Sequence, residues 1–190
     1  MYLKNLCELR KSVFIKDRRD VVLDLSDLLN DKINPPEAFF DENYVTDGMK
    51  LLLENVFNKF SAKKDIASVY ILNQSMGGGK THNMIALGLL AKYPHLRKNI
   101  FDKLGLTLFD KPIRVVGFNG RETDAPYGIW GSIAEQLKKL EQFNEYYQPL
   151  QAPGQTAWTN LLEGEPTIIL LDELPPFEPE IVVVQTEIKN

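Results

Sequence analysis

A glycine-rich turn between an apolar strand and an apolar helix carries the residues of this chain best suited to bind phosphate. The turn has the sequence SMGGGKT over residues 75–81 and follows an apolar run over residues 67–72. Three consecutive glycines let backbone N–H groups turn inward without a Cβ in the way, and the following helix adds the positive end of its dipole. We therefore predict a phosphate cradle. Its residues would be Met76, Gly77, Gly78, Gly79, Lys80, Thr81 and His82.

Two side chains at the end of this turn suit a nucleoside triphosphate and its metal ion. Lys80 can reach the β- and γ-phosphates, and the Thr81 hydroxyl can ligate the Mg²⁺ that bridges them. The usual G-x-x-x-x-G-K-[ST] pattern is incomplete, because Gln74 stands where the first glycine is expected. A glycine-rich hairpin beside a lysine is the alternative, and the strand-loop-helix context favours the phosphate loop. For His82, packing or capping competes with phosphate contact.

A second set of candidate residues closes an apolar strand far downstream. Residues 167–171 read TIILL, a run without polar alternation that predicts a strand buried on both faces, as in a parallel sheet. Asp172 then suits a Mg²⁺ site, and Glu173 is placed to polarise the water that attacks the γ-phosphate. An acidic pair after a strand is a weak signal alone. Together with the glycine turn, it predicts nucleotide hydrolysis.

The composition is that of an ordinary globular protein of about one domain. The chain has 190 residues, 44% hydrophobic and 25% charged, and a net charge of −4, so its overall charge does not indicate nucleic-acid binding. No apolar run could span a bilayer and no signal peptide is evident, which predicts a cytoplasmic protein without membrane association. With Cys7 as its one cysteine and only two histidines, the chain is expected to have neither a disulfide nor a zinc site.

Strands alternate with helices along the chain, which predicts an α/β fold with a parallel sheet flanked by helices. A helical segment over residues 1–60 is expected to precede a nucleotide-binding core over residues 61–177. Residues 178–190 form an atypical tail, in which Val182–Val184 could add one edge strand. Helices are expected over residues 21–29, 47–60, 80–93, 129–147 and 156–162, and strands over residues 67–72, 113–118 and 167–171. Residues 96–106 are expected to form another helix or an irregular crossover.

Several short motifs in combination resemble those of a family of large prokaryotic P-loop ATPases. That family is catalogued mostly as a domain of unknown function, and its members are often encoded beside DNA methyltransferases and helicases in anti-phage and restriction-modification gene clusters. The resemblance covers about residues 41–177. The motifs are YVTDG at residues 44–48, MGGGKTH at 76–82, FNGRE at 118–122, IWG at 129–131 and LDELPP at 171–176.

This resemblance implies an AAA-like (ASCE) P-loop NTPase core that binds ATP, rather than GTP, with Mg²⁺. It also implies protein partners or an oligomer, with DNA reached indirectly through a larger assembly. Family members are far longer, so the chain is expected to be an N-terminal part whose sheet is incomplete. An open sheet edge would expose apolar surface for association with another chain.

The strand over residues 113–118 ends at Asn119, which should point into the same crevice as the other strand ends. We hypothesise that the Asn119 amide hydrogen-bonds Glu173 and holds it back until a partner or substrate arrives, as a polar residue in this place does in many AAA-type ATPases. An asparagine that forms the turn before Gly120 is the alternative.

The sequence leaves three functions open. The first is an ATP-binding, Mg²⁺-dependent ATPase domain of DNA-directed phage defence, and the second is a nucleotide-binding or interaction module without catalysis of its own. The third is a small-molecule kinase. It is disfavoured because a long segment precedes the phosphate loop, and because only Arg97, Arg114 and Arg121 follow Lys80 as candidate acceptor or lid arginines.

Overall fold

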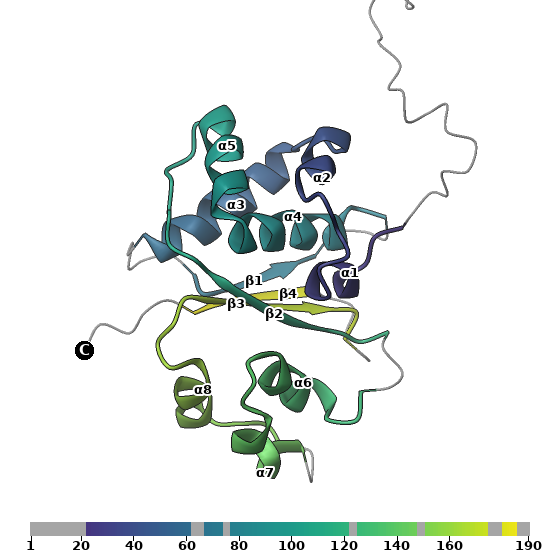
Figure 1. Ribbon diagram of the computed structural model, residues 1–190, viewed down its shortest axis with the longest axis vertical. Helices are drawn as coiled ribbons and strands as arrows, with labels where there is room; N and C mark the ends of the chain where they lie inside the picture. The colour runs from purple at the N-terminus through teal and green to yellow at the C-terminus, as the bar shows by residue number, and fades with distance from the viewer. Residues whose placement is uncertain are drawn as a thin grey trace, which may run out of the picture.

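A four-stranded sheet lies between two layers of helices in the computed structural model of the chain (Figure 1). The structure describes residues 22–61, 67–73, 77–121, 125–147, 151–174 and 180–185. The helices are α1 (Leu25–Leu29), α2 (Glu37–Glu42), α3 (Asp47–Phe60), α4 (Lys80–Lys92), α5 (Pro94–Leu104), α6 (Gly128–Gln136), α7 (Asn144–Tyr147) and α8 (Gln155–Leu162), with a 3₁₀ turn η3 (Leu140–Phe143). The strands are β1 (Val69–Leu72), β2 (Arg114–Asn119), β3 (Thr167–Asp172) and β4 (Glu180–Gln185).

The sheet is mixed, which corrects the expectation of a parallel one. Its order is β1-β4-β3-β2, with β2 and β3 parallel and β4 antiparallel to both of its neighbours. Only residues 173–179 separate β3 from β4, too few for the crossover that a parallel partner needs. The segment expected as an edge strand, Val182–Val184, therefore returns as a hairpin partner and lies inside the sheet. Because β1 and β3 are both antiparallel to β4, these two strands and β2 point in the same direction.

Alternate residues of β3 belong to two separate hydrophobic cores, one on each face of the sheet. Ile168 and Leu170 pack with helices α1, α3, α4 and α5 on one face, while Ile169 and Leu171 pack with α6, η3 and α8 on the other. All six residues of β3 are buried, which confirms the prediction of a strand covered on both faces. By contrast, β1 is an edge strand of the sheet, and its residues Val69 and Ile71 are exposed.

Helices α3 and α4 form where the sequence predicts them. Thr46 caps α3 by accepting a hydrogen bond from the Met49 N–H at 3.2 Å, and the apolar stripe of that helix is buried. Helix α4 is buried along most of its length, as expected for a helix packed on more than one side. Gly88 permits this packing, because a Cβ there would lie 2.2 Å from the Leu28 Cδ2 atom of α1.

The long helix expected over residues 129–147 is wrong, because α6 ends at Gln136. Lys138 has a left-handed φ of 59° and its N–H donates to the Glu135 carbonyl, while the Lys139 N–H donates to the Ala134 carbonyl at 2.8 Å. This pair of bonds is a Schellman ending, which glycine usually forms. The apolar periodicity continues past the ending, so the sequence gives no sign of the break.

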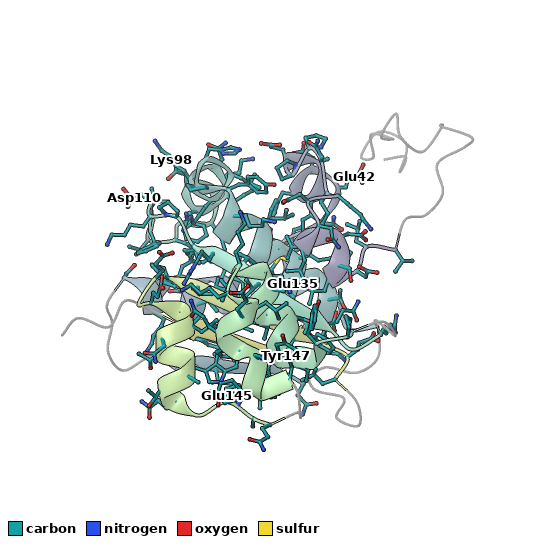
Figure 2. The ribbon with its side chains drawn as sticks, turned by 60° about the horizontal axis from the view of Figure 1, so that its bottom comes forward. Glu42, Lys98, Asp110, Glu135, Glu145 and Tyr147 are labelled. Carbon is teal, nitrogen blue, oxygen red and sulfur yellow. The ribbon has the colours of Figure 1, made fainter. Side chains whose placement is uncertain are left out.

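The sheet separates the two helical layers, with α1 to α5 above it and α6 to α8 below it in Figure 1. In Figure 2, Glu145 and Tyr147 mark the layer that contains α7, and Lys98 and Glu42 mark the opposite layer. Within the part of the chain that the structure describes, no helix is both long and apolar enough to cross a membrane.

Replacing Gly117 with alanine should weaken the sheet. An added Cβ would lie 2.4 Å from the carbonyl oxygen of Leu170 on the paired strand β3, and a backbone carbonyl has no alternative rotamer. The backbone of Gly117 is also bonded by the Gln136 side chain, which accepts from the Gly117 N–H and donates to the Gly117 carbonyl. We expect the free energy of unfolding, measured by urea denaturation, to fall by about 1–3 kcal/mol.

The matched control is Gly48→Ala in the first turn of α3. An added Cβ there would meet nothing closer than Thr46 Oγ1, at 4.0 Å, so the stability should stay equal or rise by up to about 1 kcal/mol. Equal losses in the two variants would contradict the close approach at Gly117.

Candidate functional site

Glycines 77–79 lead directly into helix α4, which begins at Lys80 as the sequence predicts. Gly77 and Gly79 have φ values of 78° and 79°, in the left-handed region that favours glycine. A Cβ at either position would meet no atom within 4 Å, so glycine is needed for its backbone conformation rather than for space. Met76, the first residue of the predicted cradle, lies outside the described residues together with Gln74.

The first turn of α4 is open to an anion. Gly79 precedes the helix in a left-handed conformation, and as the N-cap residue it has no side chain to cap the N–H groups of the turn. A left-handed residue followed by the helical Lys80 aims successive N–H groups toward one point, and the helix dipole adds positive potential there. The loop residues Gly77, Gly78 and Gly79 are all exposed, so a ligand could reach these groups.

A hydrogen bond joins the two halves of the predicted site. The Thr81 hydroxyl donates to Asp172 Oδ2 at 3.0 Å, although the two residues are 91 positions apart in sequence. Thr81 lies in the first turn of α4 and Asp172 is the last residue of β3, where its side chain is 2% exposed. The structure therefore brings the glycine turn and the acidic strand together, as the sequence predicts.

Glu173 follows Asp172 in a left-handed conformation, with a φ of 49°. Such a φ is uncommon for a residue other than glycine, and it ends the extended conformation of the strand. The carboxylate of Glu173 forms an ion pair with the Arg121 guanidinium, through Oε2 and Nε. The candidate water-polarising residue is thus bound by a cation from the loop after β2.

The expected hydrogen bond between Asn119 and Glu173 is not formed. Asn119 is buried at the end of β2, paired in register with Asp172, but its side-chain Oδ1 accepts from the Arg121 N–H at 3.1 Å. Its Nδ2 lies 3.4 Å from Ser26 Oγ of α1. This geometry corresponds to the alternative of a turn-forming asparagine. In such a turn, the N–H two residues ahead donates to the asparagine side-chain oxygen.

His82 is engaged by helix α2 rather than turned toward the loop. Asn43 Nδ2 donates to the Phe39 carbonyl, so its Oδ1 is the atom that accepts from His82 Nε2 at 2.9 Å. The His82 ring also packs against the Phe39 ring, with centroids 5.2 Å apart. The His82 side chain therefore has the packing role, one of the two alternatives that the sequence left open. The backbone N–H of His82 lies in the first turn of α4.

Oxygen ligands suitable for Mg²⁺ come from Thr81 and Asp172. Mg²⁺ prefers oxygen donors and commonly keeps water and phosphate ligands, so a hydroxyl and one carboxylate suffice from the protein. Among the described residues, no group of three or more His, Cys, Asp and Glu side chains forms a cage for a metal. The residues present fit an ion shared with a bound phosphate.

Arg97 lies inside the helical layer above the sheet and cannot serve the site. Its guanidinium carbon is 5.3 Å from the Phe57 ring centroid and 5.6 Å from that of Phe109, and Nη2 donates to the Lys111 carbonyl. Burial lowers the pKa of Arg97 to about 10, an effect that the nearby Asp110 carboxylate opposes. It therefore stays charged at neutral pH as a structural cation.

Arg114 is also distant from the candidate site. It begins β2, whereas Asn119 ends that strand, and its side chain bonds the Leu162 carbonyl and the Glu165 carboxylate. Of the three arginines after Lys80, only Arg121 reaches the site. The sequence suggests Arg121 only as a candidate acceptor or lid arginine of a kinase, although it lies two residues after Asn119 in the FNGRE motif.

Residues 17–100 match the family described as the DUF499 N-terminal domain, a domain of unknown function. The match includes the glycine loop and α4, and it ends before β2 and β3. No curated protein and no solved structure matches the chain. The N-terminal part of this chain is thus similar to a domain whose function is not known.

Removing the Thr81 hydroxyl should destabilise the ligand-free chain. Thr81→Val keeps the side-chain shape but leaves buried Asp172 without this hydrogen bond, so the free energy of unfolding should fall by about 1–3 kcal/mol. Urea denaturation without nucleotide measures the change. Thr81→Ser keeps the hydroxyl and is the control; a valine variant as stable as the serine variant would contradict the importance of this bond.

Proposed function

We propose that this chain is an ATP-binding, Mg²⁺-dependent ATPase domain of the P-loop class. The observation that carries the proposal is the 3.0 Å hydrogen bond between Thr81 and Asp172, at the mouth of a glycine loop that is open to anions. A structural hairpin would not require a buried carboxylate at this hydroxyl. A shared Mg²⁺ site does, because the two oxygens are the ligands that the protein must supply.

The direction of the strands supports the same proposal. β1, β2 and β3 point the same way, so their carboxyl ends lie on the same side of the sheet. Asn119 ends β2, Asp172 ends β3 and the glycine loop comes after β1. In α/β proteins, ligands bind in the crevice outside the carboxyl ends of such strands. The antiparallel β4 lies between β1 and β3 without altering their common direction.

Each residue has a distinct task in the proposed reaction. The Lys80 ammonium would neutralise charge on the β- and γ-phosphates, and the N–H groups of the first turn of α4 would bind phosphate oxygens. Thr81 and Asp172 would hold Mg²⁺, which supplies further charge neutralisation when bound. The Glu173 carboxylate would accept the proton of the water that attacks the γ-phosphate.

The biological setting is proposed from resemblance. The motifs that resemble those of large prokaryotic P-loop ATPases support a role in DNA-directed phage defence, and the match to a DUF499 N-terminal domain adds no function to this resemblance. In that role the domain would work in the cytoplasm with protein partners or other copies, and it would reach DNA through them rather than directly.

A nucleotide-binding module without catalysis is the second candidate. The ion pair between Glu173 and Arg121 favours it, because the carboxylate that would accept the proton of water is bound to a guanidinium. The two candidates differ in one outcome, which is hydrolysis of bound ATP by the purified chain.

Two variants separate binding from hydrolysis. Lys80→Ala should weaken ATP binding about 10- to 100-fold, since a charge-assisted phosphate contact is lost. Glu173→Gln should bind ATP normally and lose hydrolysis. Binding is measured by calorimetry with Mg²⁺, and hydrolysis by single-turnover release of phosphate.

Lys98→Ala is the control for Lys80→Ala, because Lys98 is an exposed cation on α5, in the helical layer opposite to α7 (Figure 2). Normal turnover by Lys80→Ala would refute the assignment of the phosphate loop. Tight binding without hydrolysis in the wild-type chain would favour the module that lacks catalysis.

A further inference from the structure

Among the described residues, Arg121 is a charged residue that the structure adds to the candidate site beyond those predicted. It follows β2, and its guanidinium pairs with the carboxylate of Glu173 after β3. The two strands are parallel neighbours, so the loops after them meet at the same edge of the sheet. The pair therefore connects two loops beside the proposed nucleotide crevice.

The backbone holds both partners of this pair in place. The Arg121 N–H donates to Asn119 Oδ1 at 3.1 Å, and the Gly120 N–H donates to the Asp172 carbonyl at 2.8 Å. These bonds fix the turn after β2 against the end of β3, one residue before Glu173. Glu173 itself has a left-handed φ of 49°, so the chain leaves the extended conformation of β3 at this residue.

The strength of the pair follows from its exposure. The Arg121 side chain is 75% exposed and that of Glu173 is 30% exposed. An ion pair so accessible to water contributes little free energy and weakens as salt rises, so it opens readily. It can bias the position of Glu173 but cannot lock it.

We propose that Arg121 is a positioning residue that holds Glu173 away from the attacking water, so that the chain hydrolyses ATP more slowly than its catalytic residues would allow. This inference rests on the proposed ATPase function. Glu173 must leave the guanidinium before its carboxylate can accept a proton from water. Opening of the pair is therefore a step that precedes the chemistry, and nucleotide binding does not depend on it.

The test compares Arg121→Gln with the wild-type chain in single-turnover ATP hydrolysis at saturating ATP and Mg²⁺. Glutamine removes the charge but leaves the backbone N–H that bonds Asn119, so the turn should keep its shape. We expect the rate to rise about two- to fivefold, the bias expected of an exposed pair, with an unchanged Kd for ATP. Arg121→Lys, which restores a cation, should return the rate toward the wild-type value.

Salt dependence gives an independent readout of the same mechanism. The wild-type rate should approach that of Arg121→Gln as salt is raised, whereas the rate of Arg121→Gln should change less. Lys98→Gln is the control for loss of an exposed positive charge elsewhere, and it should behave as wild type throughout.

The outcomes distinguish this inference from the proposed function. An unchanged or slower rate in Arg121→Gln, in an assay where Lys80→Ala abolishes hydrolysis, would overturn the positioning role and leave the ATPase intact. Absence of hydrolysis in the wild-type chain and in Arg121→Gln alike would overturn both.

Discussion

The hydrogen bond between Thr81 and Asp172 is the contact on which the proposed site depends. It fixes the first turn of α4 against the end of β3 and so aligns the glycine loop with the acidic residues. Packing against the surrounding helices and strands fixes the positions of α4 and β3. Helix α4 is buried beyond its first turn by α1, α3 and α5, and β3 is buried on both faces. The open first turn of α4 and the left-handed Glu173 can therefore present polar groups on a rigid base.

Local sequence signals were sufficient for the elements that build this base. The apolar stripe of α3 and the continuous apolar run of β3 each predict the observed burial, and the glycine run predicts a turn before α4, in which Gly77 and Gly79 are left-handed. The meeting of Thr81 and Asp172 could also be predicted, because parallel strands bring their carboxyl ends to one edge. The identity of the bound ligand and the reaction stay predictions.

Other features depend on contacts that no local pattern contains. Lys138 takes a left-handed helix ending that usually belongs to glycine, and Lys139 beyond it bonds the Leu161 carbonyl and the Glu163 carboxylate. The direction of β4 follows from the shortness of its connection to β3, which the apolar pattern does not reveal. The partner of Glu173 was expected to be Asn119, but the asparagine is used by its own turn and Arg121 takes its place.

The most direct test of the central claim is the effect of Mg²⁺ on ATP binding, measured by calorimetry on the wild-type chain and on Asp172→Asn. Asparagine keeps the size of the side chain and can still accept the Thr81 hydrogen bond, but it lacks the charge that a divalent cation requires. The account predicts that Mg²⁺ strengthens ATP binding to the wild-type chain and has little effect on the variant. Equal strengthening in both, or no ATP binding by the wild-type chain, would contradict a site shared by Thr81 and Asp172.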